Sequence, residues 1–72
     1  MIAYLITKYT EQAQKNPGDY SIHVRLGNLY ELMFDYKHAE EQYKTAIDKS
    51  TYGVYSSYLG LANLYLKTGK YN

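Results

Sequence analysis

The stretch RLGNLYELMFDYKHAEEQYKTAI, residues 25–47, decides the fold, because part of it returns later in the chain. Residues 60–72 read GLANLYLKTGKYN. Both stretches contain the triplet Asn-Leu-Tyr, and in both a second tyrosine follows six residues after the first. A chain that repeats a pattern in this way is expected to repeat a unit of structure.

The spacing between the matching residues gives the size of that unit. Six pairs are 35 residues apart: Leu26–Leu61, Gly27–Ala62, Asn28–Asn63, Leu29–Leu64, Tyr30–Tyr65 and Tyr36–Tyr71. A separation of 34 residues links Tyr9 to Tyr43. A period of this length holds two helices and two turns, which is typical of helical repeat arrays.

Composition limits the remaining possibilities. Seventy-two residues make one small domain, and 46% hydrophobic residues with a single proline favour a folded helical chain over disorder. The net charge of +1 provides no basic field for nucleic acid, and without cysteine there is no disulfide or thiolate zinc site. We see no signal peptide and no apolar run long enough for a membrane span. The expected location, from the absence of such signals, is the cytoplasm.

Apolar residues at helical spacing predict four helices and no strand, near residues 2–15, 20–33, 35–48 and 54–68. Pro17 and Gly18 end the first helix, and Asp19 or Ser21 can cap the second. Phe34 occupies the place that Gly69 takes one period later, at a helix end that often requires positive φ. A phenylalanine is strained in that conformation, so we expect a distorted turn there.

Residues 23–43 resemble the tetratricopeptide repeat (TPR) family. The family pattern of aromatic, Leu-Gly, Tyr, Ala and aromatic residues is matched by His23, Leu26, Gly27, Tyr30, Ala39 and Tyr43. Ala46 suits the small position that follows, and the family's proline is replaced by Thr51 but present one repeat earlier as Pro17. Next, Tyr58, Leu61, Ala62 and Tyr65 look like the first helix of another repeat.

The resemblance implies an all-α fold of antiparallel helix pairs, wound as a right-handed α-solenoid of about four helices. Residues 2–19 would be the second helix of a partial repeat, 20–53 a complete repeat, and 54–72 the first helix of a further partial repeat. Gly27 and Ala62 are small enough to allow close approach of a neighbouring helix, as are Ala39 and Ala46.

Nothing in the sequence favours an enzyme, and we expect no catalytic residue, metal site or cofactor. No glycine-rich phosphate loop follows a strand. The two histidines, His23 and His38, lack a convincing ligand spacing, so we interpret them as structural or solvated side chains.

The TPR resemblance instead implies a protein-interaction scaffold that holds a peptide or a partner domain in a concave groove. The groove candidates are Ser21, Val24, Asn28, Glu31, Leu32, Ser56, Leu59, Asn63, Leu66 and Lys67. Asn28 and Asn63 are the main expected contacts, because an amide both donates to and accepts from a peptide backbone. Val24 and Leu59 stand where some TPR domains carry a lysine that grips a C-terminal carboxylate, so we expect no such clamp.

Two alternatives remain open at this stage. The 35-residue spacing also looks somewhat like pentatricopeptide repeats, which bind single-stranded RNA, although the near-neutral charge counts against that function. The other alternative is self-assembly without a separate ligand. The predicted fourth helix is apolar nearly all round, and repeat arrays usually require polar ends. We therefore expect either a piece of a longer array or a homo-oligomer formed through the terminal helices.

Overall fold

The computed structural model describes residues 1–50 and 58–69 in full and the backbone of 55–57. These residues form four helices and no strand: α1 (Ile2–Lys15), α2 (Tyr20–Leu32), α3 (Tyr36–Lys49) and α4 (Tyr55–Thr68). The all-helical prediction is confirmed, and each helix lies within a residue of its predicted bounds. Val54, the predicted first residue of the fourth helix, lies outside the described residues.

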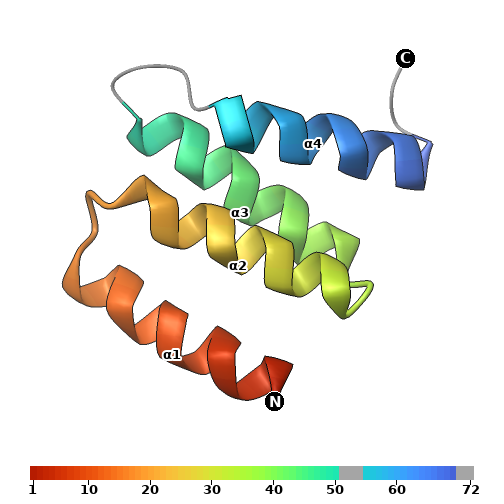
Figure 1. Cartoon of the computed structure of the whole chain (residues 1–72). Helices are drawn as coiled ribbons and strands as arrows, with labels where there is room; N and C mark the ends of the chain where they lie inside the picture. Colours follow the sequence, from red (N-terminus) through yellow and green to blue (C-terminus); the bar gives the residue numbers. More distant parts are fainter. Residues whose placement is uncertain (51–54, 70–72) are drawn as a thin grey trace.

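Successive helices run in opposite directions and lie side by side (Figure 1). The helices α2 and α4 therefore run in the same direction, with α3 packed against both, and they also contact each other directly. The molecule measures 36 × 31 × 14 Å. It is thus a thin slab in which each helix is covered on few sides.

Acidic residues begin the two central helices. Asp19 caps α2, and its Oδ1 accepts hydrogen bonds from the Ser21 backbone N–H at 3.1 Å and from the Ser21 hydroxyl at 2.6 Å. Asp35 caps α3 by accepting from the His38 N–H at 3.3 Å. Such caps satisfy backbone donors that have no partner within the helix, and each contributes about 1 kcal/mol.

The turn between α2 and α3 has the positive φ that the sequence predicted. Phe34 has φ 61° and Gly69, at the end of α4, has φ 79°. The turn is nevertheless regular, because Phe34 N–H donates to the Glu31 carbonyl and Asp35 N–H to the Tyr30 carbonyl, both at 2.9 Å. These two bonds form a Schellman motif. The predicted distortion is therefore wrong: the hydrogen bonds keep the turn geometry although the residue is unsuited to it.

We predict that Phe34→Gly is more stable than Phe34→Ala by about 1 kcal/mol, since only glycine adopts the left-handed region without steric penalty. The Phe34 side chain is 77% exposed and makes an edge-on contact with Tyr36, which both variants lose equally. Urea denaturation of the two variants measures the difference. Equal midpoints would show that the positive φ carries no strain.

The core is centred on Tyr43 of α3, whose side chain is fully buried. Its ring lies between two glycines. A Cβ at Gly27 of α2 would be 2.5 Å from Tyr43 Cε1, and a Cβ at Gly60 of α4 would be 2.7 Å from the same atom. The remaining buried apolar side chains are Ile22, Leu26, Ala39, Ala46, Leu61 and Leu64.

One small residue does not have the role that the repeat pattern suggested. Ala62 is exposed, and Gly60 is the residue that lets α4 approach Tyr43. The reason is geometric. The counterpart of Ala62 is Gly27, which faces the helix that follows α2, whereas Gly60 faces the helix that precedes α4.

Candidate functional site

Two adjoining hollows lie between α2 and α4. One has a volume of about 390 Å³ and is lined by Val24, Asn28, Glu31, Tyr43, Leu59, Gly60 and Asn63. The other, of about 300 Å³, is lined by Asn28, Glu31, Leu32 and Lys67. Because Asn28 and Glu31 belong to both, the hollows form one continuous depression, which we call the α2–α4 groove.

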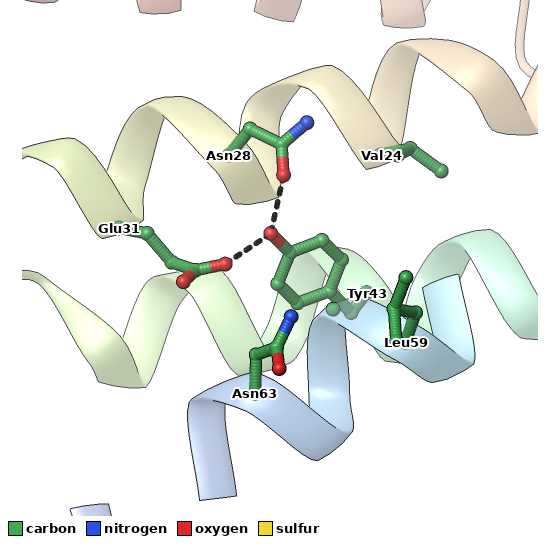
Figure 2. Close-up of a pocket in the computed structure, with 7 residues that line it drawn as sticks. Val24, Asn28, Glu31, Tyr43, Leu59 and Asn63 are labelled. Carbon is green, nitrogen blue, oxygen red and sulfur yellow. Dashed lines mark hydrogen bonds between the residues drawn. The ribbon is translucent and has the colours of Figure 1, made fainter. Parts of the chain in front are cut away.

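Tyr43 forms the floor of this groove (Figure 2). Its hydroxyl lies 2.6 Å from Asn28 Oδ1 and is also hydrogen-bonded to Glu31 Oε2. Burial, followed by the hydrogen bond to Glu31 and the charge of that carboxylate, raises the pKa of Tyr43 well above its usual range. Tyr43 is therefore a neutral hydroxyl, and because a phenol has a single proton it donates to one oxygen at a time.

Glu31 is paired a second time, across the groove. Its Oε1 accepts from Lys67 Nζ of α4 at 2.9 Å. The hydrogen bond and the charge of Glu31 raise the pKa of Lys67. The pair joins the ends of α2 and α4 and balances the two charges, so this end of the groove is polar without a net charge.

Two amides stand on opposite walls of the groove. Figure 2 shows Asn28 on α2 and Asn63 on α4, on either side of the Tyr43 hydroxyl. The amide oxygen of Asn28 accepts the hydrogen bond from Tyr43, and its amide nitrogen points away from Tyr43. Asn63 is exposed, and its side chain makes no hydrogen bond to the part of the chain that the structure describes. Both amides are thus available to a ligand backbone.

The opposite end of the groove is apolar. Val24 and Leu59 lie at that end, one on each helix (Figure 2). Val24 is half-buried and packs against the core, while Leu59 is 47% exposed. An apolar side chain of a ligand would lie between them, above the Tyr43 ring.

Most of the predicted groove residues line this depression: Val24, Asn28, Glu31, Leu32, Leu59, Asn63 and Lys67. Two do not line it. The Ser21 hydroxyl is used at the start of α2, where it donates to Asp19, and Leu66 is 64% exposed and lines neither hollow. The side chain of Ser56 lies outside the described residues.

Sequence reasoning missed Tyr43 and Gly60 as groove residues. Tyr43 was assigned to the core, where it does lie, but its hydroxyl also bonds to the groove residues Asn28 and Glu31. Gly60 left a signal in the sequence. A glycine inside a helix costs about 1 kcal/mol relative to alanine, so its presence indicates close approach of another group.

A third hollow, of about 260 Å³, lies on α1, α2 and α3. It is lined by Thr10, Ala13, Gln14, Pro17, His23, Leu26, Gln42 and Lys49. His23 Nδ1 lies 2.8 Å from Gln42 Oε1, and the other histidine, His38, lies 2.7 Å from Asp35 and stacks on Tyr30. Both histidines thus have packing or hydrogen-bonding partners within the fold.

Two further properties concern the described residues alone. Among them, no group of histidine, aspartate and glutamate side chains is arranged to hold a metal ion. None of the helices in residues 1–50 and 55–69 has the length and hydropathy needed to cross a membrane.

Comparison with known proteins gives no match: no family model, no curated protein and no solved structure is similar to this chain.

Proposed function

We propose that this protein is a TPR-like interaction module that binds an extended peptide segment of a partner protein in the α2–α4 groove. The observation that carries the proposal is the pair of asparagines. Asn28 and Asn63 are equivalent in the sequence repeat, and they stand on opposite walls of one groove. Their amides suit a peptide backbone, which presents both donors and acceptors.

Several features of the fold support a TPR-like solenoid with the repeat bounds given above. The helices alternate in direction, so that α2 and α4, the proposed first helices of successive repeats, run in parallel along the groove. Tyr43 of the proposed second helix packs between a glycine from each of them. The positive-φ residues Phe34 and Gly69 end the two equivalent helices at equivalent positions.

The groove also defines which peptides would bind. Val24 and Leu59 favour an apolar side chain at one end. At the other end Lys67 is already paired with Glu31, so it does not present a bare positive charge to a terminal carboxylate. We therefore propose an internal, extended segment with an apolar anchor as the ligand, in place of a chain terminus.

The proposed role is that of a scaffold without catalysis or cofactor. Single-stranded RNA is the alternative ligand, and it requires positive charge that tracks the phosphates. The chain carries eight lysines and arginines against seven acidic residues. A peptide is the better match to a groove whose only lining cation, within the described part of the chain, is neutralised by a carboxylate.

Selection of random peptides displayed on phage against the immobilised 72-residue chain tests this function. Titration of a synthetic enriched peptide then gives affinities for two variants of α4. We predict that Leu59→Arg weakens binding at least about tenfold, equivalent to ~1.4 kcal/mol, because it fills the apolar end of the groove with charge. The matched control Leu66→Arg alters an exposed leucine that lines neither hollow, and it should bind like the wild type.

A third variant, Asn63→Ala, should weaken the same peptide about fivefold, since a hydrogen bond contributes ~1 kcal/mol. Binding unaffected by both Leu59→Arg and Asn63→Ala would contradict the proposed site. Failure to enrich any peptide, with tight binding of a single-stranded RNA oligonucleotide whose affinity falls steeply with salt, would favour the RNA alternative.

A further inference from the structure

The outer side of α4 carries an apolar row that nothing in the described chain covers. The row consists of Tyr58, Ala62 and Leu66, which are all exposed, Tyr58 by 53% and Leu66 by 64%. We call it the α4 outer row. The three residues are spaced four apart, so they follow one another along the helix.

A second exposed row lies on α1. It consists of Tyr4, Leu5 and Lys8, on the side of α1 away from the half-buried Ile2, Ile6 and Ala13. We call it the α1 outer row. Tyr9 borders it, with its ring about 6.0 Å from the Arg25 guanidinium. Among the residues that the structure describes, α1 and α4 thus each carry an exposed row with large apolar side chains.

The internal repeat relates these two rows to faces that pack together elsewhere in the molecule. Thirty-five residues before the α4 outer row stand His23, Gly27 and Glu31 of α2. All three contact α3: His23 bonds to Gln42, Gly27 touches the Tyr43 ring, and Glu31 bonds to the Tyr43 hydroxyl.

Two residues of the α1 outer row, Tyr4 and Lys8, and the bordering Tyr9 have counterparts in α3. Thirty-four residues after Tyr4, Lys8 and Tyr9 stand His38, Gln42 and Tyr43. These three α3 residues all contact α2, since His38 stacks on Tyr30 with ring centroids 5.2 Å apart. The α4 outer row thus corresponds to the α2 side of the α2–α3 contact, and Tyr4, Lys8 and Tyr9 correspond to its α3 side.

We propose that α1 of a second copy packs on α4 as α3 packs on α2, so that copies join head to tail.

In this contact Tyr9 of the second copy lies on Ala62, as Tyr43 lies on Gly27. Lys8 meets Tyr58, a cation–π pair in place of the His23–Gln42 hydrogen bond. Leu66 replaces Glu31, which makes the new contact more apolar than its counterpart.

The proposed contact leaves the groove accessible. Asn28 lines the groove even though α3 covers the face of α2 that corresponds to the α4 outer row. By the same geometry Asn63 stays in the groove when a second copy covers the α4 outer row. The assembly depends on the internal repeat and not on the ligand of the groove, so either proposal can fail without the other.

A head-to-tail contact joins two different surfaces and does not close on itself. Each added copy offers a new α4, so the average mass rises continuously with concentration instead of stopping at a dimer. Sedimentation velocity over a hundredfold range of concentration measures this. We expect the wild-type mass to rise, and Ala62→Glu to stay monomeric over the range because it places a charge in the contact.

The matched control is Ala3→Glu, which makes the same change at another exposed alanine, in α1 and outside the α1 outer row. It should assemble like the wild type, and circular dichroism should show both variants folded. A wild type that remains monomeric throughout, or Ala62→Glu and Ala3→Glu variants that assemble equally, would overturn the proposal.

Cross-linking tests the orientation of the contact, and the chain has no cysteine to interfere. Lys8→Cys and Tyr58→Cys are made as separate variants, mixed, and treated with a short bis-maleimide. We expect cross-linked dimers in the mixture and little in either variant alone, because position 8 meets position 58 of another copy. Cross-linking of Tyr58→Cys mainly to itself would show a two-fold contact and overturn the head-to-tail arrangement.

Discussion

Gly27→Leu is expected to unfold the protein at room temperature, or to reduce its melting temperature more than any surface change. A Cβ at this position would lie 2.5 Å from the Tyr43 ring, and leucine adds three further carbons. Overpacking of a core contact costs about 1–3 kcal/mol or more. A domain of this size has a total stability of only about 4–11 kcal/mol. Thermal denaturation followed by circular dichroism measures the loss.

The control for this variant is Lys44→Ala on the exposed side of α3. Lys44 Nζ lies 3.2 Å from Glu40 Oε2, and an exposed pair of this kind contributes little to stability because water screens it. The control should therefore melt close to the wild type. Equal melting temperatures for Gly27→Leu and Lys44→Ala would mean that the α2–α3 packing described above is wrong.

Tyr43→Ala is expected to have the second large effect, a destabilisation of about 3–5 kcal/mol. The substitution removes the buried ring between Gly27 and Gly60 and also the hydroxyl that bonds to Asn28 and Glu31. Tyr43→Phe separates these two contributions, because it keeps the ring and loses the hydroxyl alone. We expect it to cost about 1.5–3 kcal/mol, the range for a hydrogen bond to a charged group.

Urea denaturation of both tyrosine variants gives the two free energies of unfolding. If Tyr43→Ala cost no more than Tyr43→Phe, the ring would not fill the space between the glycines. The double variant Gly27→Leu/Tyr43→Ala adds a further check. Removal of the ring leaves room for the leucine, so the double variant should be more stable than the sum of the two single effects predicts.

The helices and their ends could be predicted from the sequence because they depend on local interactions. Helical spacing of apolar residues gave the four segments, and Asp19 was recognised as a possible cap from its place after Pro17 and Gly18. The positive φ of Phe34 was predicted from its equivalence to Gly69. The regular geometry of that turn was not predicted, because it depends on whether the backbone hydrogen bonds still form when a phenylalanine adopts positive φ.

The small residue of α4 that meets Tyr43 could not be predicted from the repeat. The repeat pairs Ala62 with Gly27 across 35 residues, which predicted that Ala62 allows close approach of a neighbouring helix. Gly60 has Arg25 as its counterpart, so the repeat gave no sign that Gly60 meets Tyr43 in the helix before α4. Leu66 was predicted as a groove residue from its counterpart Glu31; it is 64% exposed and lines neither hollow.

The polar network of the groove also depends on tertiary structure. Lys67 and Glu31 are separated by 36 positions in the sequence, and they meet because α2 and α4 run side by side. The approach of the Tyr43 hydroxyl to Asn28 and Glu31 depends in turn on how closely Gly27 lets α3 approach α2. Sequence reasoning identified Asn28, Glu31 and Lys67 as groove residues without predicting these contacts.

The most direct test of the proposed peptide groove is a nuclear magnetic resonance titration of the ¹⁵N-labelled chain with the enriched peptide. The side-chain amide resonances of Asn28 and Asn63 report on the two walls, and the backbone amides of Val24 and Leu59 report on the apolar end. We predict that these signals shift together and saturate at one peptide per chain. Shifts confined to the third hollow, around Thr10, Gln14 and His23, with the two asparagine side chains unmoved, would contradict the account.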